Sequence, residues 1–280
     1  MANNDTRMTR TEQREAARAK AKEIRETHKK TEQRRKYTIV AGVSALVLLV
    51  GALVGWAVVA GQPAPSLTPV NLSYDNGIRI GKNLEAFTAT NKPTTEDVPV
   101  IKMYLDYQCP VCKNFEAGNI DQIKSWLDSG YATLEVHPIS FLDGKGSPNY
   151  YSSRAANAAI CVAEHSPNQF FAFNKALFEN QPEEGTAGPE NDELFKRAQS
   201  VGVMNSSKIK SCIDAKSYGD WISKTTSTVL DPKYVVPGSK VQVGGTPTIV
   251  VNGQQYQFST MDELTNAARF AQFVQKAAGN

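Results

Sequence analysis

Hydrophobic and polar positions divide this chain into a polar start, one long apolar run and a mixed remainder. Residues 1–36 contain almost no large apolar side chain, and residues 37–61 contain no charged one. At about 1.5 Å per residue, a helix over the apolar run is long enough to cross the roughly 30 Å hydrocarbon core of a bilayer. The pattern therefore predicts one N-terminal transmembrane helix, preceded by a polar tail that is either a transient helix or disordered.

The mixed remainder begins after a proline-containing stretch, residues 62–74, which we expect to be a short, stiff linker. Residues 75–280 then change repeatedly between alternating and helical spacing, as expected for a globular domain. Strands are predicted at Gly77–Gly81, Val98–Leu105 and Tyr131–Ile139. Because a helical pattern separates the last two, ending near Asp128, they are expected to pair in parallel as a β-α-β unit.

A block of helical spacing occupies about residues 147–230 and is predicted to be a helical insertion. Its most apolar part, residues 167–179, has an aromatic face that we expect to pack in the core. The chain then returns to strand patterns around Asn252-Gly253, a strong hairpin signal. Ser259 or Thr260 is expected to cap a final helix.

Charge is distributed unevenly along the chain. Residues 1–36 contain 12 Lys and Arg against 6 Asp and Glu, a net of +6, and the remaining residues have 19 against 22, a net of −3. The globular part therefore lacks the basic surface of a nucleic-acid-binding protein. Three basic residues, Arg34 to Lys36, directly precede the apolar run, and the next basic residue is Arg79. This asymmetry predicts a cytoplasmic N-terminus and an extracytoplasmic globular domain.

A cleaved signal peptide is the alternative to an anchor, since Val58-Val-Ala60 loosely resembles a cleavage site. The apolar run is longer than the usual 7–15 residues of a signal peptide, and the basic segment before it is also long. Both features favour an uncleaved anchor over residues 37–61.

Cys109 and Cys112 lie where the strand ending at Leu105 changes into a helix. The free N–H groups and positive end of a helix favour a thiolate there, so Cys109 is predicted to be the attacking sulfur. Cys112, almost one turn further along, is predicted to resolve mixed disulfides. The alternatives are a structural disulfide or half of a metal site, but a structural zinc site usually needs a second close pair.

The other two cysteines, Cys161 and Cys212, both fall in the helical block. In an oxidising compartment they suggest a structural disulfide, which would stabilise the fold by about 4 kcal/mol in the chain-entropy model. His137 precedes Pro138 at a strand end, so we favour a structural role over that of a proton shuttle. Pro247 lacks an N–H and is expected at a strand start or a sheet edge.

Together these motifs resemble the DsbA-like branch of the thioredoxin superfamily. The resemblance covers about residues 75–280 and rests on Asp106-Tyr-Gln-Cys-Pro-Val-Cys112 and on Gly245-Thr-Pro-Thr248. It implies an α/β thioredoxin fold with an inserted helical domain, Cys109 as nucleophile and Cys112 as resolving thiol. It also implies that the Thr246–Pro247 bond is cis and lies against Cys109, and that Thr246 pairs with an extended substrate.

Two positions depart from the branch. The best-known oxidase has His where this chain has Val111, and thioredoxin-type proteins often have a buried acid where this chain has Met103. Proton transfer to Cys112 could therefore use water, Asp106 or Glu135, and the sequence does not choose among them.

The resulting expectation is a membrane-anchored, extracytoplasmic thiol–disulfide oxidoreductase that needs neither a cofactor nor a metal. We expect it to oxidise reduced or misoxidised exported proteins through Cys109-Pro-Val-Cys112, with a membrane redox partner to reoxidise the pair. Two alternatives stay open: a reductase or isomerase of the same fold, and a metal-binding envelope module that uses the same cysteines.

Overall fold

The computed structural model describes residues 10–60, 67–72, 74–92 and 98–279 of the chain. It divides into two units, residues 1–63 and 64–280. The predicted linker is therefore only partly described, because residues 61–66 and 73 lie outside the described residues.

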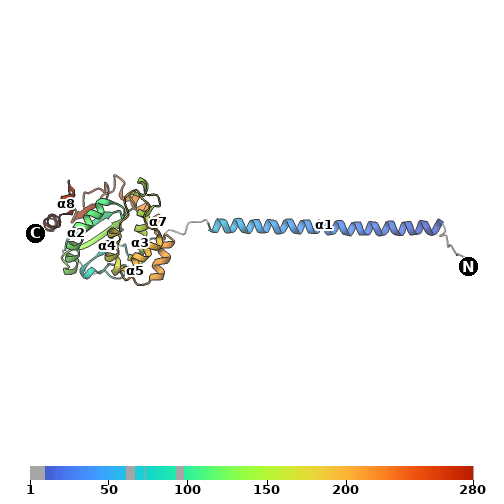
Figure 1. Ribbon diagram of the computed structural model, residues 1–280, viewed down its shortest axis with the longest axis horizontal. Coiled ribbons are helices and arrows are strands. Elements are labelled where there is room, and N and C mark those ends of the chain that lie inside the picture. The colour runs from blue at the N-terminus through green and yellow to red at the C-terminus, as the bar shows by residue number, and fades with distance from the viewer. Residues whose placement is uncertain (1–9, 61–66, 73, 93–97, 280) are drawn as a thin grey trace. The chain divides into compact units, whose positions relative to one another are not determined.

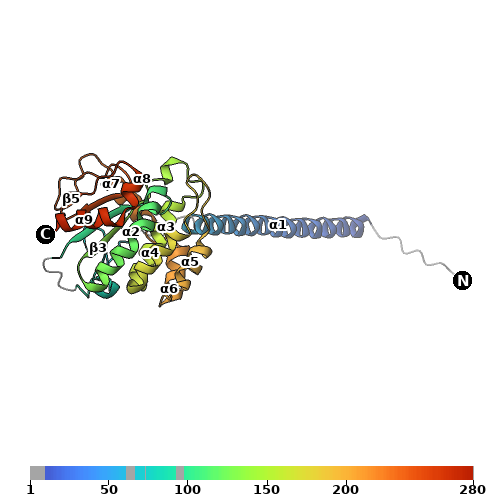
Figure 2. The ribbon, with the colours of Figure 1, turned by 60° about the vertical axis from the view of Figure 1, so that its left-hand side comes forward.

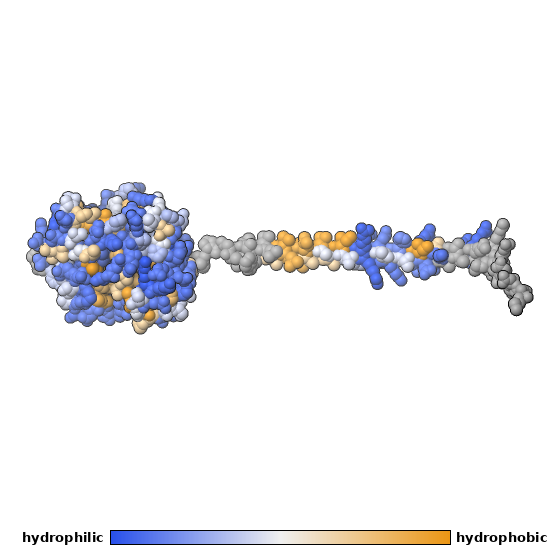
Figure 3. Space-filling view, viewed as in Figure 1, coloured by the Kyte–Doolittle hydropathy of each residue, from blue (hydrophilic) through white to orange (hydrophobic). Residues whose placement is uncertain are grey.

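The first unit is one helix, α1 (Arg10–Ala60), drawn in blue in Figures 1 and 2. Ala, Glu, Lys and Arg all have high helix propensity, so the helix runs through residue 36 without a break. Figure 3 shows a polar and an apolar stretch next to each other along it. Among the described residues this is the one helix long and apolar enough to cross a membrane, over Lys20–Ala52. Over the described residues 10–60, the tail and the predicted anchor thus differ in composition and not in secondary structure.

The described part of the predicted linker, residues 67–72, belongs to the globular unit. The Leu67 N–H donates to the Ser217 carbonyl at 3.2 Å, and the Asn71 side-chain amide donates to the Ala163 carbonyl at 3.1 Å. Leu72 is buried in the core. The proline content predicted a stiff linker here, but it could not predict these contacts, which join positions far apart in sequence.

Within the described part of the chain, five strands form one sheet in the order β1-β3-β2-β4-β5. Their bounds are β1 Ile78–Ile80, β2 Val100–Leu105, β3 Thr133–Pro138, β4 Thr248–Val251 and β5 Gln254–Gln255. β2 and β3 are parallel, with Met103 opposite Val136, and the other pairs are antiparallel. The predicted β-α-β unit is therefore confirmed. The Asn252-Gly253 hairpin is also confirmed, since both residues have positive φ between β4 and β5.

Helix α2 (Pro110–Ser129) connects β2 to β3 and ends at Gly130, whose φ of 76° suits a left-handed C-cap. It packs against α8 (Met261–Thr265) and α9 (Ala267–Ala277). The single final helix expected from the sequence is thus two helices. The Asn266 side chain accepts from the Arg269 N–H at 3.0 Å and starts a new helix there. Thr260, one of the two residues predicted to cap this part of the chain, is the N-cap of α8.

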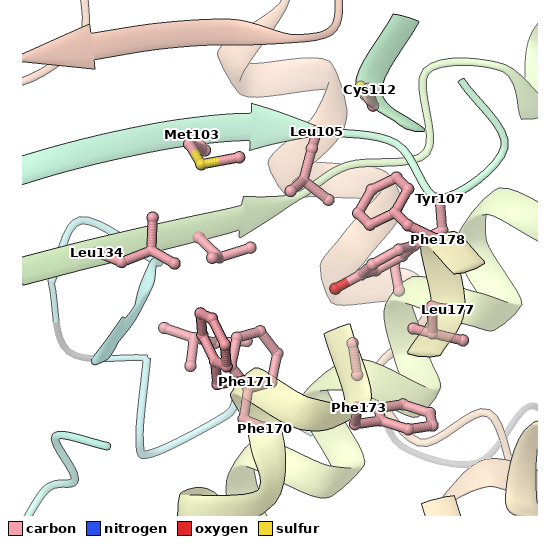
Figure 4. Close-up of a cluster of buried hydrophobic side chains, with 14 of the residues drawn as sticks. Met103, Leu105, Tyr107, Cys112, Leu134, Phe170, Phe171, Phe173, Leu177 and Phe178 are labelled. Atoms are coloured by element: carbon pink, nitrogen blue, oxygen red, sulfur yellow. The ribbon is translucent and has the colours of Figure 1, made fainter. Parts of the chain in front are cut away.

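The inserted block contains five α-helices. They are α3 (Tyr151–His165), α4 (Phe170–Glu179), α5 (Asn191–Ser200), α6 (Ser206–Asp214) and α7 (Gly219–Val229). α3 contacts each of the other four, and its buried alanines allow a close approach. Figure 4 shows the aromatic residues of α4 in one cluster with Met103 and Leu105 of the sheet, so the predicted packing role of that face is confirmed.

Candidate active site

The two predicted catalytic cysteines lie at the junction of β2 and α2. The turn after Leu105 is closed by a hydrogen bond from the Cys109 N–H to the Asp106 carbonyl, at 3.0 Å. Cys109 then occupies the N-cap of α2 with Pro110 as the first helical residue. A proline is tolerated there because the first turn has no intrahelical partner for its missing N–H. Both cysteines are free thiols in this structure, 6% and 1% exposed for Cys109 and Cys112.

The surroundings of Cys109 favour its thiolate. A hydrogen bond from the Cys112 thiol is the main reason that the pKa of Cys109 falls from 9.0 to about 6. Partial burial opposes the shift, while the Thr246 side chain and the backbone N–H groups of Cys112 and Val111 add to it. The hydrogen bond from Cys112 and the free N–H groups at the helix start therefore both support the charge on Cys109.

Cys112 has the opposite environment. Burial is the main cause that raises its pKa well above 9.0, and the hydrogen bond to Cys109 raises it further. Figure 4 shows Cys112 on α2 near the buried cluster that includes Leu105 and Tyr107. The pair therefore consists of one stabilised thiolate and one protonated, protected thiol.

Thr246 and Pro247 lie beside Cys109, as the resemblance implied. The Cys109 Sγ lies 3.3 Å from the Thr246 carbonyl oxygen, to which it can donate only as a thiol, and the Thr246–Pro247 peptide bond is cis. Pro247 immediately precedes β4, which fits its expected place at a strand start. Both residues are half-buried, so part of the surface beside the nucleophile is exposed to solvent.

Cys161 and Cys212 form a disulfide that joins α3 to α6, with their Cα atoms 5.9 Å apart. Cys161 is fully buried and Cys212 is 6% exposed. The disulfide lies wholly within the inserted helices, whereas the Cys109–Cys112 pair belongs to α2.

The two acids that the sequence offered for Cys112 lie in different environments. Burial would raise the pKa of Glu135, but hydrogen bonding and charge from His137, then Arg79 and Lys102, outweigh it and lower the pKa to about 2. The His137 Nε2–H donates to the ionised Glu135 carboxylate at 2.8 Å, and the His137 ring stacks on Tyr104 at 4.3 Å between ring centroids. Glu135 and His137 are thus part of one buried cluster of charged groups, together with Arg79 and Lys102. This agrees with the structural role favoured for His137.

Asp106 is the acid next to the cysteine turn. It is fully buried, and burial is the main cause that raises its pKa to about 7. Hydrogen bonds from Ser152, Gln108 and Leu142 oppose that shift, and the charge of Cys109 adds to it.

Several residues around the pair were not identified from the sequence. The Gln181 amide donates to the Cys109 carbonyl at 3.0 Å, and the Gln108 amide donates to the Glu183 and Thr186 carbonyls. Glu116, four residues after Cys112, is buried and bonded to Asn174 at 3.0 Å. Cys112 and Glu116 are four residues apart on the predicted helix and so share one of its faces, a spacing that could have identified Glu116. No local signal identifies Gln181, because its contact depends on the tertiary fold.

Among the described residues, no three His, Cys, Asp or Glu side chains come together in a way that could hold a metal ion. The arrangement that is present can perform thiol–disulfide exchange. It combines a stabilised thiolate at a helix start, a second thiol almost one turn further along, and the half-buried residues Thr246 and Pro247.

A thioredoxin family model matches residues 95–269. The fold is similar to that of the reduced disulfide bond oxidoreductase DsbG of Mycobacterium tuberculosis, at 28% identity and a TM-score of 0.55, covering 73% of this chain and 88% of that one. It is also similar to oxidised DsbA of M. tuberculosis, at 28% identity and a TM-score of 0.56. That match covers 73% of this chain and 93% of the DsbA chain. Oxidised BdbD of Bacillus subtilis matches at 21% identity and a TM-score of 0.55, covering 78% of this chain and 100% of its own. At that identity the match supports the fold alone. No curated protein matches. The predicted thioredoxin fold with a helical insertion is confirmed.

Proposed function

Because this chain belongs to the thioredoxin family, among the DsbA-like thiol–disulfide oxidoreductases, we propose that it is an oxidase that forms disulfides in exported proteins. The observation that supports this direction best is the place of Cys109 at the start of α2, where the Cys112 thiol and free N–H groups stabilise its thiolate and lower its pKa. Stabilising the thiolate stabilises the reduced form of the pair, which makes its disulfide a stronger oxidant.

Oxidation of a substrate begins with the Cys109–Cys112 disulfide. A substrate thiolate attacks the Sγ of Cys109, the sulfur closer to solvent, and the bond to Cys112 breaks. Cys112 leaves as a thiolate and takes up a proton, which its raised pKa favours. The product of this step is a mixed disulfide between the substrate and Cys109.

The second step completes the transfer. A second substrate thiolate attacks the substrate sulfur of the mixed disulfide and releases Cys109 as a thiolate. The substrate now has a disulfide, and its two electrons remain on the Cys109–Cys112 pair. A membrane redox partner must accept those electrons before the next cycle.

We assign substrate positioning to Thr246 and Pro247. The Thr246 carbonyl lies 3.3 Å from the Cys109 Sγ, and the residue is half-buried. An extended segment of the substrate could pair with this backbone as a strand adds to a sheet edge. Main-chain pairing would accept many sequences, as an enzyme for diverse exported proteins requires.

The proposed location of the protein rests on its N-terminal helix, α1. The apolar stretch of α1, flanked by basic residues on its N-terminal side, is proposed to be a signal-anchor over residues 37–61 with the catalytic unit outside the cell membrane. An oxidising compartment is also where the Cys161–Cys212 disulfide would persist.

The direct test is oxidation of a reduced, unfolded protein with two cysteines by a stoichiometric amount of the oxidised enzyme. The proposal predicts that the substrate gains a disulfide while Cys109 and Cys112 become alkylatable. Preferential reduction of an existing substrate disulfide by the reduced enzyme, with no oxidation in the reverse mixture, would instead assign a reductase.

A further inference from the structure

The loop between β3 and α3 carries an exposed positive charge close to the nucleophile. The Lys145 ammonium lies 3.9 Å from the centroid of the Phe141 ring, a cation–π contact. Within the described part of the chain, no ion pair includes Lys145. The nearby Asp143 carboxylate accepts from the Ser153 N–H of α3 at 3.1 Å instead. The charge on Lys145 is therefore free to attract an anion from outside the protein.

Hydrogen bonds hold this loop in place. The Leu142 N–H donates to the Asp106 carboxylate at 2.9 Å, and the Ser140 N–H donates to the Thr226 hydroxyl at 3.0 Å. The Lys145 N–H donates to the Leu142 carbonyl at 2.9 Å. A loop that is already ordered loses little freedom when a ligand binds to it, so its side chains are preorganised for contact.

The Phe141 ring connects this charge to the surface beside Cys109. A Cβ built on Gly245 would lie 3.8 Å from the Cζ of Phe141, so the ring packs directly on that glycine. Gly245 precedes Thr246, whose carbonyl oxygen lies 3.3 Å from the Cys109 Sγ. An extended chain advances about 3.3 Å per residue, so a bound substrate would reach the ring about two or three residues from its reacting cysteine.

The surface at this point suits a passing substrate side chain. Phe141 is half-buried and Lys145 is exposed, while Gly245 has no side chain that could cover the ring. The methylene groups of a lysine can lie on an apolar surface while its ammonium stays in water. Phe141 thus supports Lys145 at the edge of the site without neutralising it.

We propose that Phe141 and Lys145 form a substrate subsite for an acidic side chain on one flank of the reacting cysteine. An extended segment leaves Cys109 in two opposite directions, and only one of them passes Gly245. The preference for Asp or Glu is therefore confined to one flank. The inference rests on the thiol–disulfide chemistry of the proposed function and deepens it by naming a class of substrate sequence.

Lys145 takes no part in the covalent step. The substrate thiolate attacks the Cys109 Sγ, the bond to Cys112 breaks, and Cys112 leaves with the electron pair and takes up a proton. Lys145 acts before that step, on the encounter between the enzyme and the substrate. A charge at the rim of a binding site changes mainly the association rate and its dependence on salt.

The experiment measures the rate constant at which reduced single-cysteine peptides open the Cys109–Cys112 disulfide of the full-length protein. The peptides carry Glu or Gln at one position, either before or after the cysteine. Each rate is divided by that of the same peptide with a small-molecule disulfide, which corrects for the pKa of the peptide thiol. At low ionic strength we expect Glu to raise the rate about threefold over Gln on one flank only, and roughly 0.5 M salt to remove the difference.

Variants of Lys145 assign the preference. Lys145→Gln should abolish it and Lys145→Glu should reverse it, while the rates of the Gln peptides stay close to those of the wild type. Lys276→Glu is the matched control, because Lys276 is exposed in the last turn of α9. That turn lies beside Asn252, at the end of β4 away from Pro247. The control makes the same change in net charge and should keep the wild-type preference.

Four results would overturn the inference. They are equal rates for Glu and Gln peptides in the wild type, an equal preference on both flanks, a preference that survives in Lys145→Glu, and a preference that Lys276→Glu removes as well. If no peptide opens the Cys109–Cys112 disulfide, the proposed function fails instead, and that outcome is distinct from all four.

Discussion

The two cysteine pairs of this protein have the same chemistry and opposite environments. Cys109 and Cys112 are three residues apart at a helix start, and they are free thiols. Cys161 and Cys212 are 51 residues apart in two different helices, and they are bonded to each other. The contrast shows how the local structure around each pair makes one suited to reaction with substrates and the other to stabilising the fold.

The backbone around each sulfur explains the difference. Cys109 is the N-cap of α2, where the first N–H groups have no intrahelical partner and can stabilise a thiolate. Cys161 is within α3, where such groups are already bonded to the preceding turn, and its side chain is fully buried. Cys212 is as little exposed as Cys109, at 6%, so the free N–H groups at the start of α2 distinguish the pairs more than burial does.

The largest effect that separates the pairs is expected from Cys109→Ser. Serine cannot form a disulfide with Cys112 or with a substrate, so oxidation of a reduced substrate should be abolished. The rate is measured by the loss of free thiols from a two-cysteine peptide. The control is the double variant Cys161→Ala with Cys212→Ala, which should retain activity. Substantial oxidation by Cys109→Ser would refute the assignment of the nucleophile.

The next largest effect is on stability. Removing the 51-residue cross-link with the same double variant should lower the free energy of unfolding by about 4 kcal/mol, because the unfolded chain regains loop entropy. Urea unfolding of the globular unit, residues 64–280, followed by circular dichroism, measures this. The redox potential of Cys109–Cys112 should not change. A loss below about 1 kcal/mol would mean that the disulfide is not the structural element inferred here.

A smaller effect concerns the pH dependence of Cys109. With a pKa of about 6, it should be alkylated in the reduced protein at a rate that is half-maximal near pH 6. Since its pKa is depressed by folding, Cys109 stabilises the reduced fold fully above about pH 8.5, and this contribution is lost as the pH falls to about 6. Free energies of unfolding of reduced protein across this range test the sign. Half-maximal alkylation near pH 8.5 would show an ordinary thiol.

The smallest effect is expected from Gln181→Ala. This change removes the hydrogen bond to the Cys109 carbonyl and should cost about 1 kcal/mol of stability, with only a modest fall in the oxidation rate. Gln199→Ala, on the exposed surface of α5, is the matched control and should change neither quantity. Equal behaviour of the two variants would show that the inserted helices do not support the active-site turn through Gln181.

Local patterns in the sequence predicted the parts of the site that depend on local structure. The apolar strand before Leu105 and the helical spacing after Pro110 placed Cys109 at a helix start. The Asn252-Gly253 turn and the aromatic face of α4 were predicted for the same reason, since each depends on neighbours within a few residues.

Contacts between distant segments were not predictable in this way. Ser152 reaches Asp106 across 46 residues, and Asn174 reaches Glu116 across 58. Neither Ser152 nor Asn174 forms a motif, and only the tertiary fold brings each of them to its partner. The packing of residues 67–72 on the globular unit escaped prediction for the same reason, because proline content reports chain stiffness and not tertiary contact.

The reduction potential of the Cys109–Cys112 pair, measured by equilibration with glutathione and mass analysis of both pairs, tests the central claim most directly. We predict a value clearly less negative than about −270 mV for Cys109–Cys112, because its thiolate is stabilised, while Cys161–Cys212 stays oxidised throughout, as expected for a structural disulfide below about −300 mV. A value near about −270 mV for the first pair would mark a reductant, and reduction of both pairs together would contradict the division of roles between them.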